Sequence, residues 1–274
     1  MEEEEEEDYK EFLNAVAHNE IDRLIREDIA PFTCQLLQKD ADENLKPYAS
    51  GVFVFMEDAY YLLTAGHVID DWNEKHPLLI SVKDGHIWLA GKGFMTNYLT
   101  GKHIDIGCVR ILDVQIELLK ASYQFLTIDK MLESTFSTSW INYCLYGYPE
   151  KDYKMEGEWL VPTAAVYFAR PLPSKVFDFY QLSTDTHFVV EARGDGFDLH
   201  TGAFKKVNIE PYGVSGGGLW YISYTQTGSH YTAEAKLIGI MTAFRKGRYQ
   251  CLLANRLELA LSCIRDYPEH FQFP

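Results

Sequence analysis

The residues of this chain that could carry out covalent chemistry begin with a serine set among glycines, Ser215 within residues 213–218. Glycine lets the backbone turn sharply and brings its N–H groups close to a bound carbonyl. A serine hydroxyl is a weak nucleophile until a neighbouring base takes its proton. The sequence therefore predicts an activated nucleophile if a base can reach Ser215.

Two further segments supply the groups that such a serine needs. His67 follows the apolar run Tyr60–Thr64, where it can act as the base at the end of a strand. Asp105 stands directly before the apolar run 106–112, so its carboxylate is expected to be buried and to require a partner. A buried carboxylate holds the imidazole of a base in the productive tautomer. We therefore predict a relay of Asp105, His67 and Ser215, with the backbone N–H groups of Gly213 and Ser215 as the oxyanion hole.

The segments around these residues are typical of short β-strands. Between residues 32 and 112, β-branched and aromatic runs are separated by turn residues such as Lys83-Asp84-Gly85. A second set of such runs lies between residues 140 and 254. Helical patterns do not alternate with these strands, so the sequence predicts an all-β fold with about six antiparallel strands in each set.

One helix is expected at each end of the strand region. Apolar residues recur at three- and four-residue steps over residues 9–28, and Pro31 ends the pattern. We expect this helix to pack on its own domain; the alternative is a helix that binds a regulatory protein. Asn255 is expected to cap a C-terminal helix. The apolar face of that helix is formed by Leu257, Ala260, Leu261 and Ile264.

Composition limits the partners of this chain. It has 274 residues and a formal net charge of −15, which argues against nucleic acid and anionic membranes as partners. Part of that charge is the run Glu2–Asp8, which we expect to be a solvated tail. No apolar run approaches the roughly 20 residues of a membrane span. The histidines show no metal-binding spacing, and the predicted chemistry needs neither a metal nor an organic cofactor.

Cysteine use and the N-terminus bear on the compartment. The five cysteines are an odd number without a Cys-x-x-Cys pair, which is typical of a reducing environment. The N-terminus is acidic, whereas a secretory signal begins with basic and then apolar residues. These features predict a cytoplasmic protein.

The segments Thr64–Val68, Asp105–Val109 and Gly213–Gly217 resemble the three catalytic motifs of the chymotrypsin/trypsin-like serine proteases. Within that family they are most similar to the motifs of the bacterial HtrA-type branch, here without a PDZ module after the protease domain. The resemblance implies two six-stranded antiparallel Greek-key β-barrels with the triad between them, and hydrolysis of protein or peptide substrates through an acyl-enzyme. We expect residues 1–29 to form the acidic tail and the N-terminal helix, residues 30–135 the first barrel, and residues 136–274 the second barrel and the C-terminal helix.

The same resemblance implies where a substrate lies. Residues 239–243 look like the strand that follows the serine and lines the cleft, which makes Thr242, Ala243 and the adjacent Phe244 substrate-binding candidates. Phe244 would narrow the cleft. Ile209 is expected at the base of the specificity pocket, which favours an apolar or small residue before the cut bond. A one-residue shift would place Glu210 there instead and reverse the preference to basic residues.

Several alternatives stay open at this point. Val214 stands where the secreted branch has an aspartate that pairs with a freshly cut N-terminus, which argues against that route of activation. A latent protease that needs a partner for activation, and a non-catalytic binding module on the same fold, are both alternatives to an active enzyme. The nucleophile elbow of α/β-hydrolases is disfavoured because its order is Ser…Asp…His, and only His230 and His270 follow Ser215.

Overall fold

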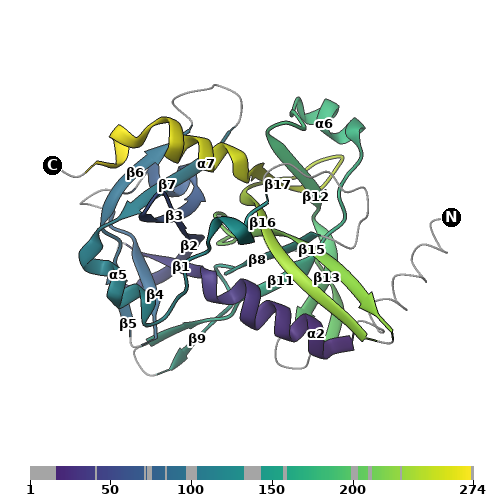
Figure 1. Ribbon diagram of the computed structural model, residues 1–274, viewed down its shortest axis with the longest axis horizontal. Coiled ribbons are helices and arrows are strands. Elements are labelled where there is room, and N and C mark those ends of the chain that lie inside the picture. The colour runs from purple at the N-terminus through teal and green to yellow at the C-terminus, as the bar shows by residue number, and fades with distance from the viewer. Residues whose placement is uncertain are drawn as a thin grey trace.

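The computed structural model of this chain has two β-sheet halves that lie side by side (Figure 1). The acidic run 2–8 and Ile209 are outside the described residues. The described residues are 17–40, 42–70, 72, 76–83, 85–96, 104–132, 143–156, 159–198, 203–208, 212–228 and 230–272.

The first half is an antiparallel sheet of seven strands in the order β5-β4-β1-β2-β3-β7-β6. Alternate side chains of these strands, such as Phe53, Leu62 and Val109, point into a shared buried core. Its strands are β1 (Thr33–Lys39), β2 (Leu45–Met56), β3 (Ala59–Ala65), β4 (Leu79–Val82), β5 (Gly85–Trp88), β6 (Gly91–Met95) and β7 (Ile106–Ile111).

The second half is an antiparallel sheet of eight strands in the order β12-β17-β16-β15-β8-β11-β13-β14. A separate hairpin pairs β9 (Tyr153–Glu156) with β10 (Trp159–Pro162). The strands of the sheet are β8 (Tyr143–Gly147), β11 (Ala165–Phe168), β12 (His187–Glu191), β13 (Arg193–Asp198), β14 (Ala203–Asn208), β15 (Gly218–Thr227), β16 (His230–Arg245) and β17 (Cys251–Arg256).

The all-β fold with two antiparallel strand sets is confirmed, whereas the expected six strands per set are not the number observed. The difference lies in short strands at the sheet edges, such as β6 and β14, which each pair with one neighbour only. Edge strands of four to six residues with mixed polarity are difficult to recognise in a sequence. One face of such a strand is exposed to solvent, so its apolar pattern is short and weak.

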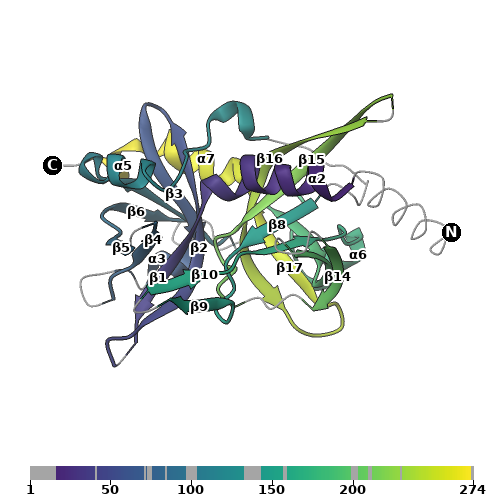
Figure 2. The same cartoon turned by 90° about the horizontal axis from the view of Figure 1, so that it is seen from below.

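The N-terminal helix packs against β16 of the second half (Figure 2). Helix α2 (Ala17–Arg23) continues into a π-helical segment, η1 (Leu24–Ile29), and a short 3₁₀ turn, η2 (Ala30–Phe32). Its apolar stripe is fully buried at Ile21, Leu24 and Ile25. Within the described residues, the stripe therefore covers the protein's own core; residues 9–16 of the expected helix lie outside them.

The remaining helices lie between strands or at the C-terminus. They are α3 (Gly66–Asp70), α5 (Asp113–Lys120), α6 (Ser174–Tyr180) and α7 (Leu257–Asp266), with 3₁₀ turns η3 (Ile128–Lys130) and η5 (Pro268–Phe271). Helix α7 carries the expected buried face, so the C-terminal helix is confirmed. The expected cap is wrong: Asn255 lies inside β17, and the residue before the helix, Arg256, makes no side-chain cap.

A central buried cluster joins the two halves. Ile106 and Cys108 of the first sheet share it with Trp220 and Ile240 of the second. This continuous core fixes the two sheets against each other, so a site at their seam has rigid walls. All five cysteines are free and buried, in agreement with the odd number of cysteines and the lack of a Cys-x-x-Cys pair in the sequence. Among the described helices, none has the length and apolar character to cross a bilayer.

Candidate active site

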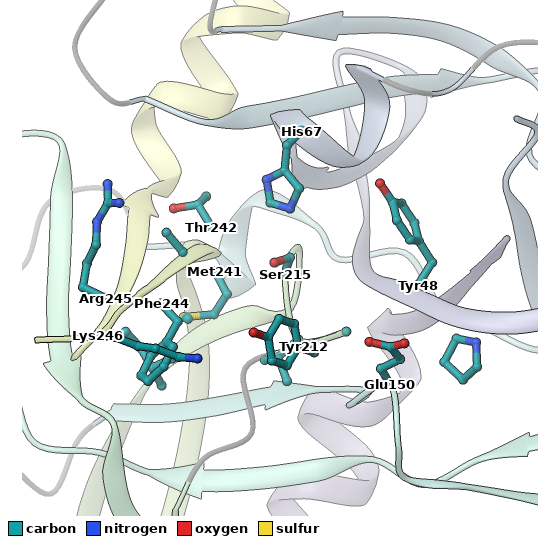
Figure 3. Close-up of a pocket in the computed structure, with 15 residues that line it drawn as sticks. Tyr48, His67, Glu150, Tyr212, Ser215, Met241, Thr242, Phe244, Arg245 and Lys246 are labelled. Carbon is teal, nitrogen blue, oxygen red and sulfur yellow. The ribbon is translucent and has the colours of Figure 1, made fainter. Parts of the chain in front are cut away.

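A pocket of about 830 Å³ opens at the seam between the two sheets (Figure 3). Pro47 and Tyr48 of β2 and His67 of α3 line it from the first half. The turn 212–215, residues 241–245 of β16 and the following Lys246 line it from the second half, and Ser215 lies near its centre. The predicted nucleophile and the predicted base thus face the same space from opposite barrels.

Asp105 holds His67 through both oxygens of its carboxylate. The imidazole Nδ1 lies 2.6 Å from Asp105 Oδ2, and the backbone N–H of His67 donates to Oδ1 at 2.8 Å. Pairing of β3 with β7 brings the two residues together, because Ala65 lies opposite Ile106. With Nδ1–H donated to the carboxylate, Nε2 is left as the acceptor that a general base needs.

Gly66 makes this close approach sterically feasible. A Cβ atom at residue 66 would come within 2.7 Å of Asp105 Oδ1. The backbone N–H of Gly66 also donates to the carbonyl of Asp105 at 2.9 Å. The glycine before the histidine is therefore required for the carboxylate to reach the imidazole.

Asn255 holds the other side of Asp105. Its side-chain oxygen accepts the backbone N–H of Asp105 at 2.9 Å, and its amide nitrogen donates to the carbonyl of Thr186 at 3.1 Å. Asn255 itself is fully buried, whereas its two partners are partly exposed. Sequence reasoning missed this role; the available signal was an amide at the end of the apolar run Cys251–Ala254.

Ser215 lies in a turn that two glycines shape. Gly213 has φ +86° and Gly216 has φ +84°, the left-handed region that favours glycine. A side chain at residue 216 would collide with the carbonyl of Ser50. In Figure 3 the imidazole of His67 is directed toward the Ser215 hydroxyl, although within the described structure no hydrogen bond joins the two side chains.

Ser50 fastens this turn from the opposite barrel. Its backbone N–H donates to the carbonyl of Ser215 at 2.8 Å, and its hydroxyl donates to the carbonyl of Gly213 at 2.9 Å. The hydroxyl also accepts the backbone N–H of Tyr148 at 2.8 Å. Both carbonyls are thereby turned toward β2, and within the described part of the chain the N–H groups of Gly213 and Ser215 have no backbone partner. The sequence indicated a strand of small residues around Ser50 but not the hydrogen bonds of its hydroxyl.

The substrate-binding candidates divide into described and undescribed residues. Thr242, Ala243 and Phe244 all line the pocket, where the sequence placed them. The Thr242 hydroxyl is nevertheless turned into the sheet and donates to the carbonyl of Leu253 at 3.4 Å. Ile209 lies outside the described residues. Tyr212, which the sequence analysis did not single out, stands 57% exposed at the pocket rim.

Other nucleophiles and metal sites are not favoured by the geometry. Burial raises the pKa of Cys251 and Cys263 to about 11, so neither thiol is ionised at neutral pH. Among the described residues, no group of three or more His, Cys, Asp and Glu side chains is placed to hold a metal ion.

Comparison with known proteins bears on the fold. No protein-family model and no curated protein sequence matches this chain. Among solved structures, it is similar to the crystal structure of the scabies mite inactivated protease paralogue S-I1, with 14% identity and a TM-score of 0.54. The match covers 88% of this chain and 95% of that one. The fold is that of the trypsin-like serine proteases.

This trypsin-like fold confirms the double-barrel architecture that the three motifs implied. At 14% identity the likeness shows the fold alone. It does not support the HtrA-type branch in particular. The mite protein is described as inactivated, so this likeness carries no information about activity in the present chain.

Proposed function

We propose that this protein is a serine endopeptidase that cuts protein or peptide substrates through an acyl-enzyme formed on Ser215. The observation that carries the proposal is that Asp105 forms two hydrogen bonds with His67, one to the imidazole and one to the backbone N–H, and that His67 and Ser215 line the same pocket. A protein that only binds ligands has no need of this arrangement. The intact pair therefore favours catalysis over a binding module.

The reaction follows from the roles of the three side chains. His67 Nε2 takes the hydroxyl proton as Ser215 Oγ attacks the carbonyl carbon, and the Asp105 carboxylate stabilises the imidazolium. The N–H groups of Gly213 and Ser215 stabilise the negative oxygen of the tetrahedral intermediate. His67 then donates the proton to the leaving amine, and water, activated in the same way, releases the acid product. No cofactor takes part.

The sequence motifs also support placing the chain in the HtrA-type branch, and the free thiols support a reducing compartment such as the cytoplasm. The apolar side chains of Met241, Phe244 and Leu252 in the pocket lining support an apolar or small residue before the cut bond. Val214 offers no carboxylate next to Ser215 that could pair with a freshly cut N-terminus, which argues against activation by that route.

A latent protease is the second candidate, because no hydrogen bond joins the His67 and Ser215 side chains in the described structure. Such bonds often tighten only when substrate is present. A regulatory partner that draws His67 toward Ser215 would have the same effect. The described part of the N-terminal helix is buried against the protein's own core, so such a partner would have to act on the cleft loops or on other surfaces.

A fluorophosphonate probe, which reacts with activated serines, tests the proposal. Wild type is expected to become labelled, and Ser215→Ala is expected to lose the label. Ser223→Ala removes an exposed serine of β15 and is the matched control that should stay labelled. Labelling that appears only after a cell extract is added would support the latent enzyme. Absence of labelling under both conditions would contradict both candidates and leave a binding module.

A further inference from the structure

The turn between β16 and β17 carries an unusual concentration of positive charge. Arg245, Lys246 and Arg248 place three cations within four residues, separated by Gly247. The whole chain has 25 basic against 40 acidic residues, so the charge of this segment is opposite in sign to the net charge of the protein. We call residues 245–248 the basic turn.

The basic turn stands at the mouth of the pocket that contains Ser215. Arg245 and Lys246 both line this pocket. Figure 3 shows the Lys246 side chain extending toward Tyr212, and its Nζ lies 6.0 Å from the centre of the Tyr212 ring. Such a distance is at the limit of a cation–π contact, which holds the ammonium in place without neutralising it. Lys246 and Arg248 are exposed to solvent.

None of the three cations forms an ion pair with a carboxylate in the described residues. By contrast, Arg23, Lys46 and Lys130, which do not line the pocket, are each paired with an aspartate. Unpaired cations in a strongly anionic protein attract an anionic ligand at long range and can pair with it on contact.

A carboxylate marks the other end of the pocket. Glu150 lies on the side of Tyr48, whereas Lys246 and Arg245 lie across Tyr212 from it (Figure 3). The pocket is therefore polarised, with positive charge at the β16 end and negative charge at the β2 end. A bound peptide experiences opposite fields on the two sides of Ser215.

We propose that this cleft selects peptides with an acidic side chain at the end lined by β16, and that the basic turn is the recognition element. As a statement about substrates it rests on the proposed function. As a statement about binding it does not, because the charges act on any peptide held in the pocket. The apolar lining of Met241, Phe244 and Leu252 and the basic turn contact different side chains of one bound peptide.

Binding to the Ser215→Ala chain tests this selection without turnover. The probes are two fluorescein-labelled alanine-based peptide pools that differ only in a fixed residue, glutamate or glutamine, and binding is measured by anisotropy. The glutamate pool is expected to bind about three- to tenfold more tightly, the gain expected when one carboxylate interacts with two or three exposed cations. Added salt is expected to reduce this preference, because screening weakens exposed pairs.

Variants assign the preference to the basic turn. Replacing Arg245, Lys246 and Arg248 by glutamine in the same chain is expected to abolish it. Lys175→Gln on α6, which removes an exposed lysine that does not line the pocket, is expected to keep it. Glu150→Gln is expected not to reduce it. Circular dichroism verifies that each variant is folded.

The outcomes separate this inference from the proposed function. Equal or unmeasurable binding of the glutamate pool, or a preference that survives loss of the basic turn, would overturn charge selection. Fluorophosphonate labelling of the wild-type chain reports on the protease independently. A glutamate preference without labelling would leave an acidic-peptide binding module, and labelling without the preference would leave a protease of other specificity.

Discussion

The side-chain oxygen of Asn255 accepts the backbone N–H of Asp105 at 2.9 Å, across the seam between the two sheets. The same amide donates to the carbonyl of Thr186, so Asn255 ties the backbone of Asp105 to a loop of the second barrel. Asp105 in turn orients His67. The position of the His67 imidazole therefore depends on a residue that does not line the pocket.

Replacement of Asn255 by leucine tests this positioning role. The variant leaves the N–H of Asp105 without its partner, which costs about 1–3 kcal/mol. The carbonyl of Thr186 loses one of its two hydrogen bonds and keeps the one from the backbone N–H of Arg256. We expect lower stability in urea, together with a fall in kcat that exceeds any change in KM. Asn255→Asp, which keeps an acceptor for Asp105, is expected to lose less activity. Unchanged kcat in a folded Asn255→Leu chain would contradict the role.

Ser50→Ala removes the hydroxyl that fixes the turn around Ser215. The carbonyl of Gly213 and the N–H of Tyr148 lose their buried partner, while the backbone bond to Ser215 stays. We expect a stability loss of about 1–3 kcal/mol and slower fluorophosphonate labelling, because the oxyanion N–H groups are less well oriented. Ser223→Ala, at an exposed position, serves as the control. Labelling at the wild-type rate would show that the turn does not need this support.

Asp105→Asn tests the carboxylate itself. The amide is close in size, so the fold is expected to persist, but it favours the wrong imidazole tautomer and cannot stabilise the imidazolium. Peptide hydrolysis is expected to fall by about 10⁴, the loss measured for the corresponding change in the well-studied serine protease triad. The measurement is kcat/KM beside a circular dichroism spectrum. Near-full activity would remove Asp105 from the mechanism.

The strand-rich fold and the contact between Asp105 and His67 were predictable because each depends on local pattern. Short apolar runs with turn residues indicate strands, and His67, Asp105 and Ser215 each stand at the end or start of such a run. The structure places His67 after β3 and Asp105 before β7, and the pairing of those strands joins them.

The supporting residues were not predictable, because their partners are far away in sequence. Asn255 was expected to cap α7, the local use of an asparagine before a helix, whereas its actual partner is 150 residues away. Ser50 meets Gly213 across 163 residues. A sequence pattern shows local preference, and tertiary hydrogen bonds override it.

The pH dependence of stability offers a test at the N-terminal helix. The Glu20 carboxylate accepts two hydrogen bonds from Arg23, at 2.8 and 3.0 Å, and one from the backbone N–H of Ala233 in β16. The hydrogen bonds from Arg23, followed by the one from Ala233, hold the pKa of Glu20 below its usual value of 4.5, against the opposing effect of partial burial.

A carboxyl group whose folded pKa lies below its unfolded pKa stabilises the fold above the unfolded value, and this contribution is lost as pH falls through the folded pKa. Glu20→Gln is therefore expected to lower stability at pH 7 and to weaken the acid dependence below about pH 4.5. Urea unfolding between pH 7 and pH 3 measures both effects, with Glu234→Gln, an exposed glutamate of β16, as the control. Parallel stability curves for wild type and Glu20→Gln would show that this contact does not anchor the helix through its charge.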